Sequence, residues 1–149
     1  MNNGRYLPPT YLFISLAAML LLHLFAPVHQ IIPYPWNAAG LVLLALGITL
    51  NLLADRAFRV YGTTVKPFEE STVLITSGTF RYSRNPMYLG LVLILTGVAL
   101  LLGTPSCFII IPVFAIIIDR VFITSEEKML DQRFGDNWKA YKTRVRRWI

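Results

Sequence analysis

Cysteine and histidine are nearly absent from this chain. Its 149 residues include one cysteine, Cys107, and two histidines, His23 and His29. A single cysteine excludes an internal disulfide and a cysteine-based metal cluster, and two histidines do not make a histidine-rich metal site. The sequence also lacks a P-loop and the motifs GxGxxG, HExxH, GxSxG and CxxC. Classical nucleotide folds, zinc chemistry and hydrolytic triads therefore have no support, and we expect no bound metal.

Charged residues are scarce as well. They make up 15% of the chain, hydrophobic residues make up 55%, and the mean hydropathy is +0.55. Soluble domains carry about 25% charge, so this composition excludes an ordinary soluble globule and also excludes disorder. The net charge is +6. Because the basic residues border apolar runs, we expect anionic lipid headgroups rather than nucleic acid as their partner.

The apolar residues gather in three runs, at 11–28, 38–54 and 87–118. A bilayer core of ~30 Å needs about 20 helical residues. The uncharged third run is too long for one span, and the turn sequence 103–106 divides it into a helical hairpin. We therefore predict one all-α integral membrane domain over residues 1–149, with about four transmembrane helices. The predicted spans are approximately 10–28, 37–55, 86–102 and 107–123.

Charge placement predicts the orientation of these spans. The connections 29–37 and 103–106 contain no charged residue, so every lysine, arginine, aspartate and glutamate falls on the opposite side. The positive-inside rule then puts both termini in the cytoplasm. We take the first run as an anchor, because no convincing A-x-A cleavage site follows it. A prokaryotic plasma membrane is the default location.

Two segments are expected on the cytoplasmic side, a loop at 56–85 and a tail at 124–149. The loop is long and contains the apolar stretch 73–75, with turn residues at Gly62, Pro67 and Gly78. Long loops of this kind are usually functional or disordered. Because this loop has apolar side chains to bury, we expect it to be ordered against the helix ends.

The tail is predicted to be an amphipathic helix. Thr124 and Glu127 have capping-box spacing, and Gly135–Asp136 is expected to interrupt the helix. An apolar stripe recurs at helical steps, formed by Leu130, Phe134, Trp138, Tyr141, Val145 and Trp148. Two compatible interpretations follow. The helix anchors the chain on anionic lipid at the interface, or part of it roofs a cofactor site.

Two separated motifs are candidates for chemistry. Asn85–Pro86 has the residue types that begin a helix, and the free N–H groups there can receive a carboxylate or phosphate. Gly90 allows a ligand or another helix to approach closely. Glu126 and Glu127 either complement a helix dipole or hold a cationic or hydroxyl-rich ligand. Because a hairpin joins the two motifs, both return to the same end of the molecule and form a candidate site.

Other polar groups have simpler interpretations. The pairs Asp55–Arg56 and Asp119–Arg120 end apolar runs, and such adjacent opposite charges are usually solvated. His23 and Asn51 lie inside the predicted spans. Either makes a helix–helix hydrogen bond or serves a site, and the sequence leaves both alternatives open.

These motifs resemble a known family. The stretches 72–78 and 84–90 (Arg-Asn-Pro-Met-Tyr-Leu-Gly), followed by Glu126–Glu127, Phe134–Gly135 and Tyr141, are similar to the isoprenylcysteine carboxyl methyltransferases and the phospholipid N-methyltransferases. That family has the pattern R-H-P-x-Y-x-G, then a helical hairpin, then E-E. The resemblance covers roughly 60–147. It implies a membrane enzyme that uses S-adenosylmethionine as its methyl donor.

The resemblance also implies which residues contact that cofactor. The loop before the third helix is expected to sandwich adenine, and the helix start is expected to take the methionine carboxylate. Glu126 is expected to accept hydrogen bonds from the ribose or to attract the cationic end. The cofactor-binding residues implied in this way are Thr72, Val73, Leu74, Ile75, Phe80, Asn85, Pro86, Met87, Tyr88 and Glu126.

Two positions depart from the family pattern. Asn85 replaces the family histidine and does not titrate near neutral pH, so we assign no catalytic base. Phe122 stands where the prenylcysteine enzymes have an arginine beside the substrate carboxylate, and Arg120 lies on a different helical face. Arg120 and Phe122 are the candidate substrate-pocket residues. The phenylalanine favours a more apolar acceptor pocket.

The sequence thus predicts methyl transfer from S-adenosylmethionine to a lipophilic acceptor, through a carboxylate, thiol or amine, at the cytoplasmic face of the membrane. Two alternatives remain open. One is an NADPH-dependent reductase of the sterol-reductase-like group, in which Arg81 and Arg84 hold the 2′-phosphate. The other is a non-catalytic lipid-binding or scaffold protein, which would bind no cofactor.

Overall fold

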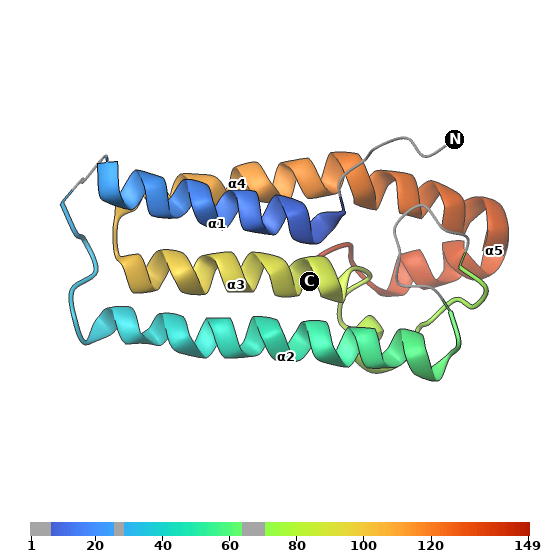
Figure 1. The fold of residues 1–149 in the computed structure, drawn as a ribbon. Helices are drawn as coiled ribbons and strands as arrows, with labels where there is room; N and C mark the ends of the chain where they lie inside the picture. Colours follow the sequence, from blue (N-terminus) through green and yellow to red (C-terminus); the bar gives the residue numbers. More distant parts are fainter. Residues whose placement is uncertain (1–6, 26–28, 64–70) are drawn as a thin grey trace.

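The computed structural model describes residues 7–25, 29–63 and 71–149. Within these ranges the chain forms helices joined by turns, with no strand. Four apolar helices lie alongside one another (Figure 1), and they are α1 (Pro8–Phe25), α2 (Ala39–Val60), α3 (Pro86–Leu102) and α4 (Pro105–Ile118). The predicted all-α class is confirmed.

The helices have the length and composition of membrane spans. Three stretches, Pro8–Phe25, Trp36–Val60 and Pro105–Arg144, are long and apolar enough to cross a bilayer, while α3 is a shorter apolar helix of 17 residues. Exposed large apolar side chains cover the outer faces, for example Phe13, Leu46 and Ile109. The chain is an integral membrane protein, because such a surface is stable only in lipid.

Several helix boundaries differ from the prediction, and the first helix begins at Pro8 rather than near residue 10. The second helix continues past Asp55 to Val60, and the fourth begins at Pro105, directly after a turn at Gly103. Gly103 has a φ of 67°. That left-handed conformation suits glycine and ends α3.

A larger difference lies at the end of α4. The chain passes through a π-helical turn, Asp119–Ile123, straight into α5 (Thr124–Arg144). The capping-box prediction is therefore wrong, because a continuous helix has no free N–H groups to cap. The Thr124 hydroxyl instead donates to the Asp119 carbonyl at 2.8 Å. For the same reason, Glu126 and Glu127 do not complement a helix dipole.

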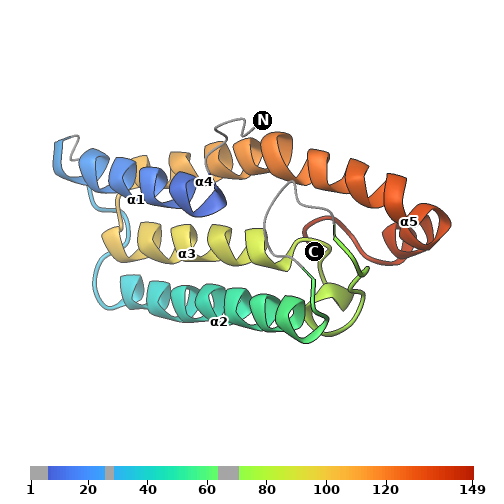
Figure 2. The same cartoon turned by 45° about the vertical axis from the view of Figure 1, so that its right-hand side comes forward.

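Helices α1 and α4 lie side by side, α3 lies in the middle, and α2 lies at the edge (Figures 1 and 2). Side chains of α1, α3 and α4 share the main core, which includes Met19, Leu95 and Phe114. Helix α2 packs mainly on α3. The start of α1, the start of α3 and the C-terminal residues lie at one end of the bundle (Figure 1), which we call the site end.

Glycines bring α2 and α3 unusually close together. Gly40 faces Gly97, and Gly47 faces Gly90. A methyl group added at Gly40 would lie 2.3 Å from the Gly97 carbonyl oxygen, and one added at Gly47 would lie 2.6 Å from the Gly90 carbonyl oxygen. The backbones thus touch directly, which is how membrane helices gain packing energy without a hydrophobic driving force. The partner that Gly90 admits is another helix.

Hydrogen bonds join the connections at the opposite end. The Ile31 amide donates to the Gly103 carbonyl at 2.9 Å, and the Asn37 side chain donates to the Leu101 carbonyl at 3.2 Å. His23 Nδ1 lies 3.3 Å from the Thr104 hydroxyl. The hydrogen-bond interpretation of His23 is confirmed, since this contact links α1 to the α3–α4 turn.

The described part of the loop before α3 is ordered, as predicted, whereas Pro67 lies outside the described residues. Ile75 and Phe80 are buried against Ala54 of α2, and a short 3-10 helix, η2 (Gly78–Arg81), leads toward α3. A second such helix, η1 (Trp36–Ala38), precedes α2. The loop is therefore anchored on the end of α2.

Helix α5 folds back over this loop. The predicted interruption is confirmed, because Gly135 has non-helical φ and ψ values of 48° and −117°. The apolar stripe of the tail then packs inside the protein, where Trp138, Tyr141 and Val145 form a small core with Leu74. The stripe is therefore largely occupied by protein contacts.

Candidate functional site

A cavity of about 700 Å³ lies at the site end, between the start of α3, α5, the loop before α3 and α2. This volume suits a cofactor or other small molecule. Among its lining residues are nine from the set that the sequence implies for cofactor binding. They are Val73, Leu74, Ile75, Phe80, Asn85, Pro86, Met87, Tyr88 and Glu126. Thr72 is exposed and does not line the cavity.

Tyr88 and Glu126 form the polar centre of this cavity. The Tyr88 hydroxyl donates to Glu126 Oε1 at 2.6 Å, which joins the first turn of α3 to α5. Glu126 lies in the polar helix α5, beyond the membrane-spanning α4. Burial raises the pKa of Glu126 to about 7, although the hydrogen bond from Tyr88 lowers it. The carboxyl group is therefore poised to be either neutral or anionic near physiological pH.

Apolar side chains form the walls around this pair. Phe80 of the loop packs edge-to-face on Phe58 of α2, with ring centroids 5.5 Å apart. Leu130 and Trp138 of α5 also line the cavity. Part of the tail thus covers this cavity, as the roof interpretation expects. Flat walls of this kind suit an aromatic ring, because aromatic and aliphatic groups pack closely on its faces.

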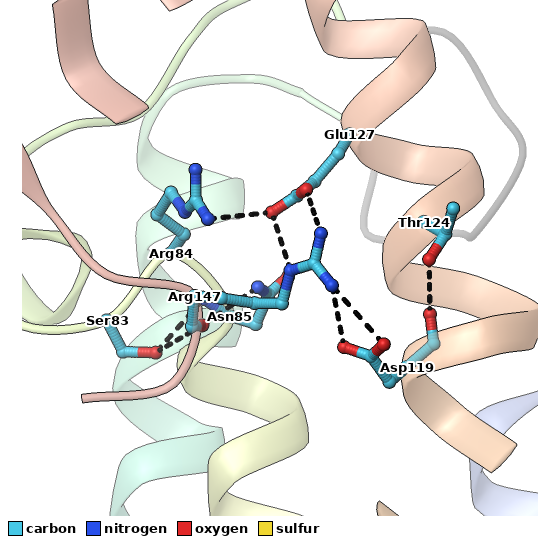
Figure 3. Close-up of polar contacts among 7 residues, drawn as sticks. All are labelled: Ser83, Arg84, Asn85, Asp119, Thr124, Glu127 and Arg147. Carbon is cyan, nitrogen blue, oxygen red and sulfur yellow. Dashed lines mark hydrogen bonds and ion pairs between the residues drawn. The ribbon is translucent and has the colours of Figure 1, made fainter. Parts of the chain in front are cut away.

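Behind the cavity lies a network of buried and half-buried ion pairs (Figure 3). Glu127 Oε1 is 3.1 Å from Arg84 Nη2, and Glu127 Oε2 is 2.5 Å from Arg147 Nη2. Arg147 Nη1 also lies 3.1 Å from Asp119 Oδ1. Hydrogen bonding to Glu127 raises the pKa of the Arg147 guanidinium. Two positive and two negative side chains thus compensate one another, which lowers the cost of burying them.

The same network ties down the C-terminal residues. The Asn85 side chain donates to the Arg147 carbonyl at 3.0 Å, and the Arg84 amide donates to the Arg146 carbonyl at 3.0 Å. The Ser83 hydroxyl also donates to the Arg147 carbonyl, at 3.4 Å. We call this arrangement the C-terminal clamp, formed by residues 145–148 held against residues 83–85. It fixes the segment that begins α3, and thereby Tyr88.

Two expectations need correction here. Asp119 is not merely solvated, because it pairs with Arg147. Asn85 occupies the N-cap position of α3, but its side chain makes no capping hydrogen bond and donates to Arg147 instead. Arg147 itself was missed. No spacing rule connects it with Asp119 or Asn85, since the contact arises only when α5 folds back.

Arg84, the first residue of the motif at 84–90, has a buried side chain. Its side chain is 7% exposed and lines the cavity, and its Cζ atom lies 5.6 Å from the centre of the Trp138 ring. The nearby Tyr141 hydroxyl donates to the Phe80 carbonyl at 2.7 Å. Burial raises the pKa of Tyr141 to about 12, whereas Arg84 lowers it, so that the hydroxyl keeps its proton. Arg81 is exposed and does not line this cavity, so the structure does not gather Arg81 and Arg84 into one phosphate pocket.

The candidate substrate-pocket residues lie outside the cavity. Phe122 is fully buried, with its ring centroid 5.5 Å from that of Tyr11 and 6.2 Å from that of Tyr88. Arg120 is exposed on the other side of the helix. Phe122 therefore packs beside the Tyr88 ring from within the core.

Asn51 does line the cavity, and its side chain donates to the Gly47 carbonyl of its own helix at 2.9 Å.

The cavity fits S-adenosylmethionine in size and chemistry. Apolar walls suit adenine, a carboxylate suits ribose hydroxyls or a cationic sulfonium, and a buried guanidinium suits a carboxylate. Residues on three elements supply these groups, namely Phe80 in the loop, Glu126 on α5 and Arg84 before α3. An apolar wall, a hydrogen-bond acceptor and a hydrogen-bond donor thus line a single cavity.

Comparison with known proteins points in the same direction. Residues 36–137 match the family model described as phospholipid methyltransferase. The chain is 40% identical over 63 residues to an uncharacterized protein of Haemophilus influenzae, a stretch that covers 42% of this chain and 100% of that protein.

Two yeast proteins, both named protein-S-isoprenylcysteine O-methyltransferase, are also similar. The one from Schizosaccharomyces pombe is 33% identical over 76 residues, or 49% of this chain and 31% of that protein. The one from Saccharomyces cerevisiae is 30% identical over 155 residues, or 97% of this chain and 63% of that protein. The chain thus spans less than two thirds of each yeast enzyme.

Proposed function

Because this chain belongs to the phospholipid methyltransferase family, we propose that it transfers a methyl group from S-adenosylmethionine to a lipophilic acceptor. The acceptor atom is the oxygen of a carboxylate, the sulfur of a thiol or the nitrogen of an amine. The observation that carries the proposal is the cavity at the site end. Nine of the ten residues that the family resemblance implies for cofactor binding line this one space.

Different residues of the cavity would bind different parts of the cofactor. Ile75 and Phe80 would hold the adenine ring, the start of α3 would receive the amino-acid end, and Glu126 would accept hydrogen bonds from the ribose or attract the positive charge. When bound, the cofactor supplies an already activated methyl group. The protein therefore acts mainly by holding the reacting groups about 3–3.5 Å apart and in line.

No residue is proposed as a dedicated base. Asn85 does not titrate near neutral pH, and a carboxylate or thiolate acceptor needs no deprotonation, while an amine must arrive neutral. Helix α5 contributes instead by covering one side of the cavity with Leu130 and Trp138, which reduces the contact of the reacting groups with water. Phe122 holds the Tyr88 ring in place from within the core.

We place the site at the cytoplasmic face of a prokaryotic plasma membrane, with both termini in the cytoplasm. The soluble cofactor would enter from water and the lipophilic acceptor laterally from the bilayer. Exposed basic side chains lie near the clamp, at Lys139, Lys142, Arg144 and Arg146. They are suited to anionic headgroups of the same leaflet.

Binding of S-adenosylhomocysteine and of NADPH to the detergent-purified protein tests this proposal, with calorimetry as the measurement. We expect S-adenosylhomocysteine to bind and NADPH not to bind. Binding of NADPH alone would favour the reductase alternative. Binding of neither ligand, to protein whose circular dichroism shows intact helices, would favour a lipid-binding or scaffold role.

A further inference from the structure

Arg84 carries a buried positive charge that the protein only half satisfies. Its Nη2 atom lies 3.1 Å from Glu127 Oε1, but its Nε and Nη1 atoms are buried and have no hydrogen-bond partner among the described residues. Buried donors without partners are costly, and a guanidinium cannot escape the cost by losing its proton. A position of this kind suits a ligand that completes the hydrogen bonding.

Among the described residues, the groups around Arg84 are already engaged or apolar. Glu127 is held from its other side by Arg147, which contacts both of its carboxylate oxygens (Figure 3). The Trp138 ring lies 5.6 Å from Arg84 Cζ and restricts the guanidinium further. Figure 3 shows one end of the guanidinium directed at Glu127 and another nitrogen directed away from it. Arg84 lines the cavity, so a small rotation of its side chain would bring the two unused donors to an occupant.

We propose that Arg84 is the anion-binding group of this cavity and that it holds the carboxylate of the amino-acid part of S-adenosylmethionine. This inference rests on the proposed function. It adds a residue that the sequence considered only for a nucleotide phosphate, and it makes a charged side chain, rather than the helix start alone, the main determinant of that subsite.

The distribution of charge across the cavity favours this end of the cofactor. Arg84 lies directly before α3, whose first N–H groups favour negative charge as well. Glu126 lines the same cavity and carries the opposite sign when ionised. A ligand with a carboxylate and a sulfonium cation matches both groups, whereas a lipophilic tail suits the apolar lining at Leu91 and Pro9.

Two ligands that differ only in the carboxylate provide the test. They are S-adenosylmethionine and decarboxylated S-adenosylmethionine, titrated into the wild-type protein and into Arg84→Met. For the wild-type protein, we expect the decarboxylated ligand to bind about ten- to a hundredfold more weakly, as is typical of hydrogen bonds to a charged group. In Arg84→Met, we expect the difference between the ligands to shrink to about twofold or less.

The variant is expected to fold, because Glu127 keeps its contacts with Arg147. Arg81→Met is the matched control, since it removes an exposed arginine that lies outside the cavity. This control should keep the wild-type preference for the carboxylate. A melting curve for each variant separates lost binding from lost folding.

The outcomes distinguish the two proposals. If the wild-type protein binds neither ligand, the proposed function fails. If the wild-type protein binds both but Arg84→Met keeps the full preference, Arg84 does not hold the carboxylate, although the function stands. An equal loss of both ligands in Arg84→Met would also overturn the inference, because it would indicate a structural role or contact with the acceptor.

Discussion

The Tyr88 hydroxyl donates a 2.6 Å hydrogen bond to Glu126 Oε1, and this contact joins α3 to α5 at the polar centre of the site. The two residues are 38 positions apart in the chain. They meet because the α3–α4 hairpin returns the chain to its starting end and the helix then continues unbroken into α5. The hydrogen bond thus couples the position of the site carboxylate to the packing of the membrane helices.

Tyr88→Phe should weaken binding of S-adenosylhomocysteine by about three- to tenfold, the usual worth of one hydrogen bond. The aromatic ring, which packs beside Phe122, stays in place, but Glu126 loses a hydrogen-bond partner, so we expect a modest fall in the melting temperature without loss of the fold. Tyr82→Phe is the control, because Tyr82 is exposed and does not line the cavity. Calorimetry measures the affinity. Equal affinity in the wild type and both variants would remove Tyr88 from the site.

Binding of the cationic cofactor should depend on pH through Glu126. Burial raises the pKa of Glu126 to about 7, so its carboxylate form becomes populated as the pH rises. Between pH 6 and pH 8 the ionised fraction increases about tenfold, and the affinity for S-adenosylmethionine should increase similarly. S-adenosylhomocysteine lacks the sulfonium charge and should show a smaller dependence. Glu126→Gln should remove the difference between the two ligands, and a difference that persists in this variant would assign it to another group.

The same pKa shift predicts an effect on stability. A pKa raised above the ordinary value means that the folded state favours the protonated form, so that stability is lost as the pH rises from about 4.5 to about 7. Glu126→Gln should therefore melt at a higher temperature than the wild type at pH 8, with a much smaller difference at pH 5. Thermal melts in one detergent at both pH values measure this. A variant less stable than the wild type at pH 8 would contradict the prediction.

Substitution in the glycine contacts should separate α2 from α3. Gly47→Ala would place a methyl group 2.6 Å from the Gly90 carbonyl oxygen, a backbone atom that has no room to move. We expect a loss of about 1–3 kcal/mol in the free energy of unfolding, as is typical of overpacking. The neighbouring Leu46→Ala is the control, since Leu46 is 53% exposed on the outer face. Similar melting temperatures for the two variants would show that the helices adjust without strain.

Arg147 and Asp119 should be energetically coupled within the C-terminal clamp. Both side chains are partly exposed, at 35% and 22%, so their direct interaction is expected to contribute only about 1 kcal/mol. A double-mutant cycle with Arg147→Met and Asp119→Asn measures the coupling from unfolding in detergent. Arg147→Met alone should cost more than Asp119→Asn, because it also leaves Glu127 with one partner fewer. Strictly additive effects would show that the ion pair contributes nothing.

Much of the cavity lining was predictable, the start of α3 from local sequence and the loop residues from the family resemblance. The start of α3 at Pro86 and its end at Leu102 agree with the predicted span, and the apolar loop residues line the cavity as expected. Contacts that need the chain to fold back on itself were not predictable. Arg147 pairs with Glu127 and Asp119 only because Gly135 turns α5 back toward the start of α3.

The sequence by itself determined the class of the protein, since apolar runs of sufficient length must form helices that bury their backbone polar groups in lipid. It also determined which end of the bundle carries the polar motifs, because a hairpin returns the chain to the side it left. Tertiary structure alone decided that α4 and α5 form one continuous helix, that glycines bring α2 against α3, and that Arg84 keeps two unpaired donors beside the cavity. Each of these three features depends on contacts between segments that are distant in the sequence. Hydrophobic periodicity carries no information about such tertiary contacts.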